Sequence, residues 1–280
     1  MKFVVNAELA YEVNQRSTLL LCIHAYSTSN QLLSNEIFTT TRGATCDFFP
    51  LEAGQNRYVR IDTHDLSELL ITYSVDVETN PDSQRVVDID SVPITDVSPE
   101  ALPYLFPSRY CESDELGPDA FRLFGNILGP LQKAKAVADW IFNNVTYQAG
   151  ASDSSTTAMD TYRTRQGVCR DFAHLGIAFC RALSIPARYF AGYAANMHPQ
   201  DFHACFEICV GNEWFLIDPT RMSHPLGMVR IATGFDAANT SVATIFGDVQ
   251  LTRSSVDCQP AEGQILTPES LEGRVISLEP

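Results

Sequence analysis

The sequence predicts an α+β protein in which an all-β, sandwich-like domain precedes helices packed on an antiparallel sheet. Two observations support this class. The first third of the chain alternates apolar and polar residues in short runs broken by turn residues. The middle of the chain then shows helical periodicity, and hairpin-forming strands follow it.

The N-terminal domain is predicted to span residues 1–95. The runs that alternate with a period of two are residues 2–11, 17–26, 56–62 and 68–78. Gly43, Gly54, Asn80 and Pro81 separate them as turn residues. Several short strands at such spacing are typical of an antiparallel sandwich.

A proline-rich connector is expected over residues 96–117. Four prolines (Pro93, Pro99, Pro103 and Pro107) fall between residues 92 and 107. Proline removes a backbone donor and is excluded from helix interiors, so this stretch suits an extended link. The remaining residues, 118–280, are assigned to a second, core domain.

Helices are predicted first in this core. Pro130 suits a first helical position, and apolar residues recur behind it on one helical face up to Val145. A short helix is expected at residues 158–165 and a longer one at residues 169–183, which Pro186 follows. Strands are predicted at residues 187–193, 203–210 and 213–217.

The composition excludes several classes of function. Asp and Glu outnumber Lys and Arg by 34 to 19, which gives a net charge of −15. This balance opposes nucleic-acid binding and attachment to an anionic membrane surface. The longest early apolar run, at residues 19–23, is far shorter than the ~20 residues that span a bilayer. Without a recognisable signal peptide, a cytoplasmic protein with mostly reduced thiols among its eight cysteines is expected.

Cys169 is the strongest candidate for a nucleophile. It lies at or next to the N-terminus of the predicted helix at residues 169–183, behind Gly167 and Val168. The partial positive charge of a helix N-terminus favours the thiolate, which is the nucleophilic form. A buried structural cysteine is the alternative, but Gly167 permits close backbone approach and favours a functional interpretation.

His203 and Asp218 are predicted to meet across a hairpin. Gly211-Asn212 is a suitable two-residue turn, expected to be of type II′. If Val210 and Glu213 flank it, Asp218 comes opposite Cys205, and His203 lies on the same strand face. The two side chains are then diagonal neighbours at ~7–8 Å between backbones. The carboxylate can fix the imidazole tautomer while the other ring nitrogen meets a thiol.

In such an arrangement the thiolate attacks a carbonyl carbon, and the resulting oxyanion needs hydrogen-bond donors. The backbone N–H of Cys169 is one candidate. The second is expected to be an upstream side chain, with Gln148 as the first choice and Tyr147 and Gln166 as rivals.

These motifs closely resemble the bacterial transglutaminase-like superfamily, whose members are often described as cysteine proteases. The resemblance rests on the order and spacing of several segments, namely residues 167–175, 181–189, 192–193, 203–204 and 218–220, with Trp140, Trp214 and residues 230–238 in support. It implies a papain-like core with Cys169 as nucleophile, His203 as acid/base and Asp218 as orienting carboxylate. It also implies that no metal or cofactor is needed. The family usually has Trp where this chain has Cys205, which places a second thiol near the site and is expected to alter the wall of the groove.

The sequence therefore predicts a thiol-dependent acyl-transfer enzyme that acts on amide bonds of a peptide or protein. Hydrolysis by a peptidase or amidase is the first interpretation, because water outcompetes an amine unless the groove excludes it. A cross-linking transglutaminase with the same triad is the alternative, as is a non-catalytic protein-binding module. A zinc site at His203, Cys205 and Cys209 is disfavoured, because along a strand these residues spread over ~20 Å. The oligomeric state is left open.

Overall fold

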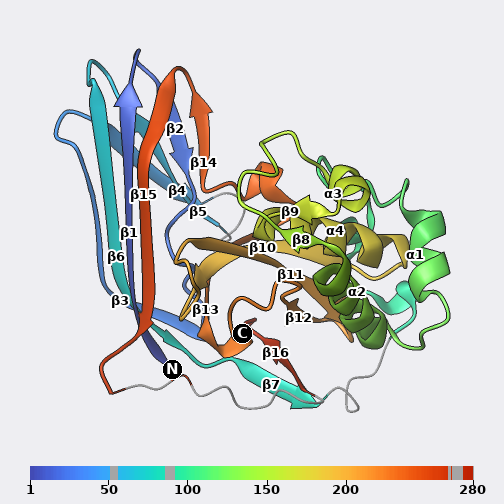
Figure 1. Cartoon of the computed structure of the whole chain (residues 1–280). Coiled ribbons are helices and arrows are strands. Elements are labelled where there is room, and N and C mark those ends of the chain that lie inside the picture. Colours follow the sequence, from blue (N-terminus) through green and yellow to red (C-terminus); the bar gives the residue numbers. More distant parts are fainter. Residues whose placement is uncertain (51–55, 86–91, 264–265, 267–273, 280) are drawn as a thin grey trace.

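The computed structural model describes residues 1–50, 56–85, 92–263, 266 and 274–279. Figure 1 shows two halves side by side, a β-sandwich and a lobe in which helices cover one antiparallel sheet. The predicted α+β class, with an all-β N-terminal part, is confirmed.

The sandwich consists of two four-stranded sheets. The first has the order β15 (Val249–Pro260), β1 (Lys2–Val13), β6 (Glu68–Thr79) and β3 (Gln31–Thr40). The second has the order β14 (Ala243–Phe246), β2 (Thr18–Leu21), β5 (Arg57–Asp62) and β4 (Thr45–Pro50). Burial alternates along β1 and β6, as the sequence pattern predicts for strands with one face in a core. The strands β3 and β4 were not predicted.

One part of the predicted domain division needs correction. The strands β14 and β15 belong to the C-terminal part of the chain, which the sequence placed in a core of residues 118–280. β15 instead pairs antiparallel with β1, and β14 pairs with β2 (Figure 1). Apolar alternation marks a strand but carries no information about which distant strand it joins, so the sequence pattern could not assign these two to the sandwich.

The helical lobe follows the predicted order. Its helices are α1 (Gly117–Phe124), α2 (Pro130–Asn144), α3 (Ala158–Thr164) and α4 (Cys169–Ala182). Its sheet has the order β12 (Glu213–Ile217), β11 (Phe202–Val210), β10 (Ala187–Ala194) and β13 (Met228–Gly234). Two short pairs complete the described sheets, β8 (Thr146–Tyr147) with β9 (Gln166–Gly167) and β16 (Arg274–Ser277) with β7 (Asp82–Arg85). Single 3₁₀ turns lie at Ile94–Asp96, Leu102–Leu105, Pro225–Gly227 and Ala237–Asn239.

The helix α4 is the centre of this lobe. It packs against β10 and β11, and α1, α2 and α3 pack against it. Gly176 allows the close approach, because a Cβ there would lie 2.4 Å from the ring of Phe206 on β11. The tight packing of α4 on the sheet fixes the position of its N-terminus, where Cys169 lies.

Side-chain amides join the two halves along β13. Gln31 donates from Nε2 to the carbonyl of Arg230 and accepts from its N–H, both at 2.8 Å. Asn56 does the same for Thr233, at 2.8 and 3.0 Å. These buried amides take the place of a neighbouring strand, so the sandwich satisfies backbone groups of the sheet in the helical lobe.

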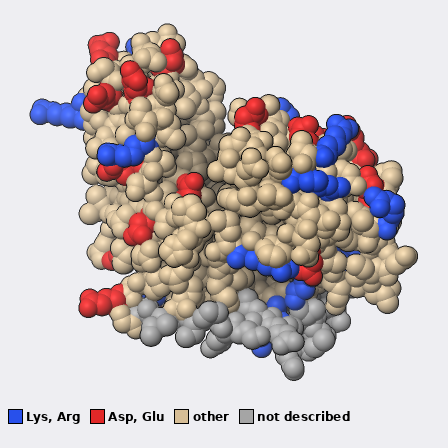
Figure 2. All heavy atoms as spheres, viewed as in Figure 1, with Lys and Arg blue, Asp and Glu red and all other residues tan. Residues whose placement is uncertain are grey.

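The visible surface carries charges of both signs. In Figure 2 the Lys and Arg side chains lie mostly over the helical lobe, whereas Asp and Glu occur on both halves. Among the described residues, no helix combines the length and the apolar character required to cross a bilayer.

Candidate active site

Cys169 is the first residue of α4, and the preceding turn is held by Asp171. The Asp171 carboxylate accepts a hydrogen bond from the N–H of Val168 at 2.8 Å and is also bound by Ser152. Its other oxygen, Oδ1, forms a salt bridge with Nη2 of Arg170 at 3.1 Å. A Cβ at Gly167 would lie 2.7 Å from Cβ of Asp171, so glycine is required for this approach. Sequence reasoning recognised Gly167 but missed Asp171, although an acidic residue at the third helical position is a common capping signal.

His203 and Asp218 meet across the β11–β12 hairpin. The observed register pairs Val210 with Glu213 and Phe206 with Ile217, as predicted. The turn itself differs, because Gly211 and Asn212 both have positive φ (62° and 65°), which is the type I′ rather than the expected type II′ conformation. Asparagine tolerates this left-handed backbone, so either turn keeps the same register.

The ring of His203 is oriented by Asp218. Nε2 of His203 lies 2.9 Å from Oδ2 of Asp218, and the histidine is only 2% exposed. The other carboxylate oxygen accepts from the N–H and the hydroxyl of Thr220, both at 2.8 Å. Thr220, which sequence reasoning did not single out, therefore fixes the carboxylate of Asp218, and Asp218 in turn orients the ring of His203.

The environment favours the charged imidazolium. Burial lowers the pKa of His203, but the charge and hydrogen bond of Asp218 and a further contribution from the Cys169 thiol outweigh it, raising the pKa to about 10. Nδ1 of His203 is buried and has no hydrogen-bond partner within the described residues. The nitrogen not used by Asp218 is thus available to the sulfur.

Cys169 and His203 line one groove between the two halves. Its volume is about 480 Å³. The sandwich supplies Leu9 and Tyr11 of β1 and Leu251 of β15 to its wall. The two candidate reacting residues therefore line a cavity that both halves build, with Cys169 partly exposed and the side chain of His203 buried.

Tyr147 is brought close to Cys169 by the parallel pairing of β8 with β9, in which it stands opposite Gly167. Burial raises the pKa of Tyr147, with Cys169 contributing through its charge, while a hydrogen bond from the Cys169 backbone N–H lowers it. The backbone N–H of the first-choice residue, Gln148, donates to the carbonyl of Gly167 at 2.8 Å. No contact between its side chain and Cys169 is recorded among the described residues.

Cys205 does not form a groove wall as expected. It is fully buried in a cluster with Phe190, Leu216 and Met228. Burial raises the pKa of its thiol well above the ordinary value. The next residue, Phe206, packs against Gly176 of α4, so Cys205 points to the opposite face of the sheet.

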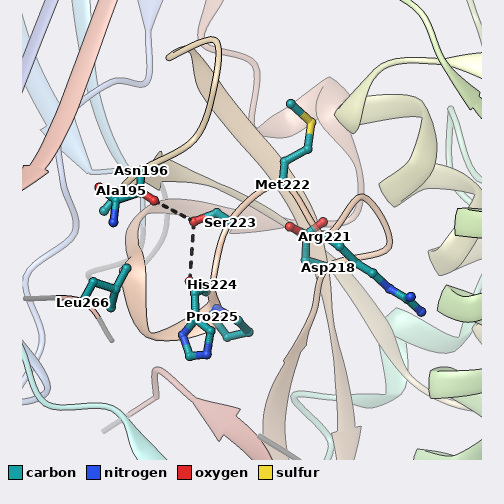
Figure 3. Close-up of a pocket in the computed structure, with 9 residues that line it drawn as sticks. All are labelled: Ala195, Asn196, Asp218, Arg221, Met222, Ser223, His224, Pro225 and Leu266. Atoms are coloured by element: carbon teal, nitrogen blue, oxygen red, sulfur yellow. Dashed lines mark hydrogen bonds between the residues drawn. The ribbon is translucent and has the colours of Figure 1, made fainter. Parts of the chain in front are cut away.

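A second pocket lies beside Asp218. It measures about 450 Å³, and Figure 3 shows Ser223, His224 and Met222 around it. Arg221 extends away from it and pairs with Asp139 of α2. Within the described part of the chain, no group of three or more His, Cys, Asp or Glu side chains is placed to hold a metal ion.

Comparison with known families gives two matches. The transglutaminase-like superfamily matches residues 120–219, and the bacterial transglutaminase N-terminal domain matches residues 1–100. The first match contains Cys169, His203 and Asp218.

A crystal structure of a protein from Cytophaga hutchinsonii, named as a putative cysteine protease, is similar over 100% of this chain and 98% of its own. It has a TM-score of 0.95 and 40% sequence identity. An uncharacterized protein of Mycobacterium leprae is 27% identical over 170 residues, and one of Mycobacterium tuberculosis is 40% identical over 63 residues. The alignment with the Mycobacterium leprae protein covers 55% of this chain and 58% of that protein. The alignment with the Mycobacterium tuberculosis protein covers 22% of this chain and 20% of that protein. The matched region thus spans little more than half of the first relative and a fifth of the second.

Proposed function

Because the chain belongs to the transglutaminase-like superfamily, with a bacterial transglutaminase N-terminal domain, we propose that it is a thiol-dependent acyl-transfer enzyme acting on amide bonds. The observation that carries this proposal is the 2.9 Å contact between His203 and Asp218, with the free nitrogen of the ring beside a helix-terminal cysteine. This is the arrangement of an activated thiol.

In the first half of the reaction the Cys169 thiolate attacks the carbonyl carbon of the amide. The new S–C bond pushes the carbonyl electrons onto oxygen, and the C–N bond then breaks. His203, held as an imidazolium by Asp218, gives its proton to the leaving amine. The product is a thioester between the acyl group and Cys169.

The oxyanion of the tetrahedral intermediate requires two donors. The backbone N–H of Cys169 is one. We propose Tyr147 as the second in place of Gln148, because its hydroxyl interacts with the same N–H and with the thiol. A carbonyl oxygen that displaces this contact would meet both donors at one point.

In the second half a nucleophile resolves the thioester. Neutral His203 takes a proton from water, the hydroxide oxygen attacks the acyl carbon, and the Cys169 thiolate leaves. Hydrolysis is the proposed outcome, because Cys169 is partly open to solvent in the groove. An amine entering by the same route would give cross-linking instead.

A screen of glutamine-containing peptides with and without a primary amine tests the proposal. Hydrolysis of a side-chain amide adds about 1 Da, amine transfer adds the mass of the amine less about 17 Da, and peptidase action cleaves the chain. We expect turnover in the unmodified protein and none in Cys169→Ala.

Cys46 provides the matched control, since it is the other partly exposed cysteine. Cys46→Ala is expected to retain full turnover. If Cys169→Ala is as active as Cys46→Ala, the nucleophile is wrong. If neither the variants nor the parent turn over any peptide while the protein binds them, a non-catalytic binding module is the better interpretation.

A further inference from the structure

Asp201 lies in the groove next to the candidate reacting groups. It immediately precedes β11, two residues before His203, and lines the same cavity as Cys169. Its Oδ1 accepts a hydrogen bond from the N–H of Phe202 at 2.8 Å. Partial burial raises the pKa of its carboxyl, whereas the charge of His203 lowers it, so the two side chains influence each other.

The loop that carries Asp201 is anchored to the sandwich. Gln200 accepts from the N–H of Cys258 on β15 at 3.0 Å and donates to the carbonyl of Met197 at 3.0 Å. The sandwich therefore fixes the loop at the place where the two halves meet. This gives the sandwich a role in holding the carboxylate at the groove.

Among the described residues, Asp201 forms no ion pair with a Lys or Arg side chain. Among the described residues that line the groove, it is the one carboxylate, and Arg170 is the one Lys or Arg. The Arg170 guanidinium is committed elsewhere, to Asp171 and to the carbonyl of Asp153. The charge of His203 also acts on Asp201, but the His203 ring is already paired with Asp218. The carboxylate of Asp201 therefore remains open to a cationic partner.

The remaining walls suit an aliphatic stem behind a charged end. They include Tyr189, Ala191, Ala204 and Ile231 on the helical lobe. Long cationic side chains bury their methylene groups against such surfaces while the charged end meets a partner. A substrate with a lysine-like or arginine-like group would satisfy both features.

We infer that Asp201 selects substrates that carry an ammonium or guanidinium group beside the amide attacked by Cys169. This inference rests on the proposed function, since it names the substrate class of the same groove. It goes beyond that function by assigning the specificity to one carboxylate that takes no part in bond breaking.

Three thiol reagents of one chemistry test the inference without a known substrate. They are the neutral methyl, the cationic 2-(trimethylammonio)ethyl and the anionic 2-sulfonatoethyl methanethiosulfonates, each of which forms a mixed disulfide and releases methanesulfinate. Rates at Cys169 are read by mass spectrometry of the peptide that contains it. Removing a unit charge several ångströms away should lower the cation-to-anion rate ratio about three- to tenfold in Asp201→Asn.

Asp114→Asn is the matched control, because this exposed aspartate in the turn before α1 removes the same charge away from the groove. It should keep the parent ratio, Asp201→Glu should also keep it, and Asp201→Lys should lower it further. An unchanged ratio in Asp201→Asn, or an equal fall in Asp114→Asn, overturns the inference. The neutral reagent tests the proposed function separately. If it labels Cys169 no faster than Cys46, the proposal that the Cys169 thiol is activated is wrong. The ratio of the cationic to the anionic labelling rate still decides the role of Asp201 in that case.

Discussion

Nε2 of His203 lies 2.9 Å from Oδ2 of Asp218, although 15 positions separate the two residues: His203 lies in β11 and Asp218 directly follows β12. The hairpin register alone brings them together, and burial makes the pair strong, because a charge-assisted hydrogen bond is shielded there from competing water.

Replacing Asp218 is expected to lower the pKa of His203. Asp218→Asn keeps an acceptor for Thr220 but removes the charge that holds the pKa at about 10. The titration midpoint of the His203 ring, followed by NMR with labelled histidine, should move to lower pH. Turnover should fall, because the carboxylate no longer fixes the imidazole in the required tautomer. An unchanged midpoint would mean that another group orients the ring. Asp47→Asn, in the exposed pair with Arg60, is the control.

The same pair makes stability depend on pH. The pKa of His203 is raised from 6.5 in an unperturbed histidine to about 10 in the folded protein. Its stabilising contribution is therefore complete below pH 6.5 and is lost as the pH rises toward 10. The free energy of unfolding should fall more steeply over this range in the parent than in Asp218→Asn.

Gly167→Ala is expected to damage both stability and reactivity. The added Cβ would lie 2.7 Å from Cβ of Asp171, which caps the turn before Cys169. Overpacking of this kind costs about 1–3 kcal/mol, measurable by urea denaturation. Alkylation of Cys169 should slow as well. Gly117→Ala, where a Cβ meets nothing within 4 Å, should change neither quantity.

Tyr147→Phe tests which of the two candidate residues, Tyr147 or Gln148, is the second oxyanion donor. It keeps the ring packed on Phe172 and removes only the hydroxyl. Loss of one oxyanion donor typically lowers kcat about 10²- to 10³-fold with little change in KM. Gln148→Ala should leave kcat nearly unchanged. The reverse pattern would restore Gln148 as the donor.

Asn56→Ala tests whether the sandwich stabilises the sheet of the helical lobe. The substitution leaves the backbone N–H and carbonyl of Thr233 without their buried partner. Each such loss costs about 1–3 kcal/mol. Asn14→Ala, which removes an exposed contact with Asp248, should cost far less. Equal effects of the two substitutions in urea denaturation would contradict the role of Asn56.

The sequence predicted best where local pattern determines structure. The helix Cys169–Ala182 follows from its apolar periodicity and the Gly167 break, and the meeting of His203 with Asp218 follows from a two-residue turn and a period of two. These relationships involve neighbours within about 15 residues, for which chain geometry leaves few alternatives.

Long-range partners were beyond sequence reasoning. The pairing of β15 with β1 joins strands at opposite ends of the chain, and their alternation fits several possible neighbours. The groove depends on that pairing, because Leu9 and Leu251 form part of its wall. Asp201 was missed for the same reason, since one loop carboxylate gains meaning only beside Cys169 and His203. Cys205 lies near the site, as expected, but it packs in a buried cluster instead of lining the groove.

Alkylation by iodoacetamide near neutral pH tests the central claim most directly. Cys46 is an internal reference of comparable exposure, and the other six cysteines are buried. We predict that Cys169 reacts at least tenfold faster than Cys46 and that His203→Ala removes this difference, because the imidazolium partner of the thiolate is lost. Equal rates at the two cysteines, or a fast Cys169 that is indifferent to His203→Ala, would contradict the account.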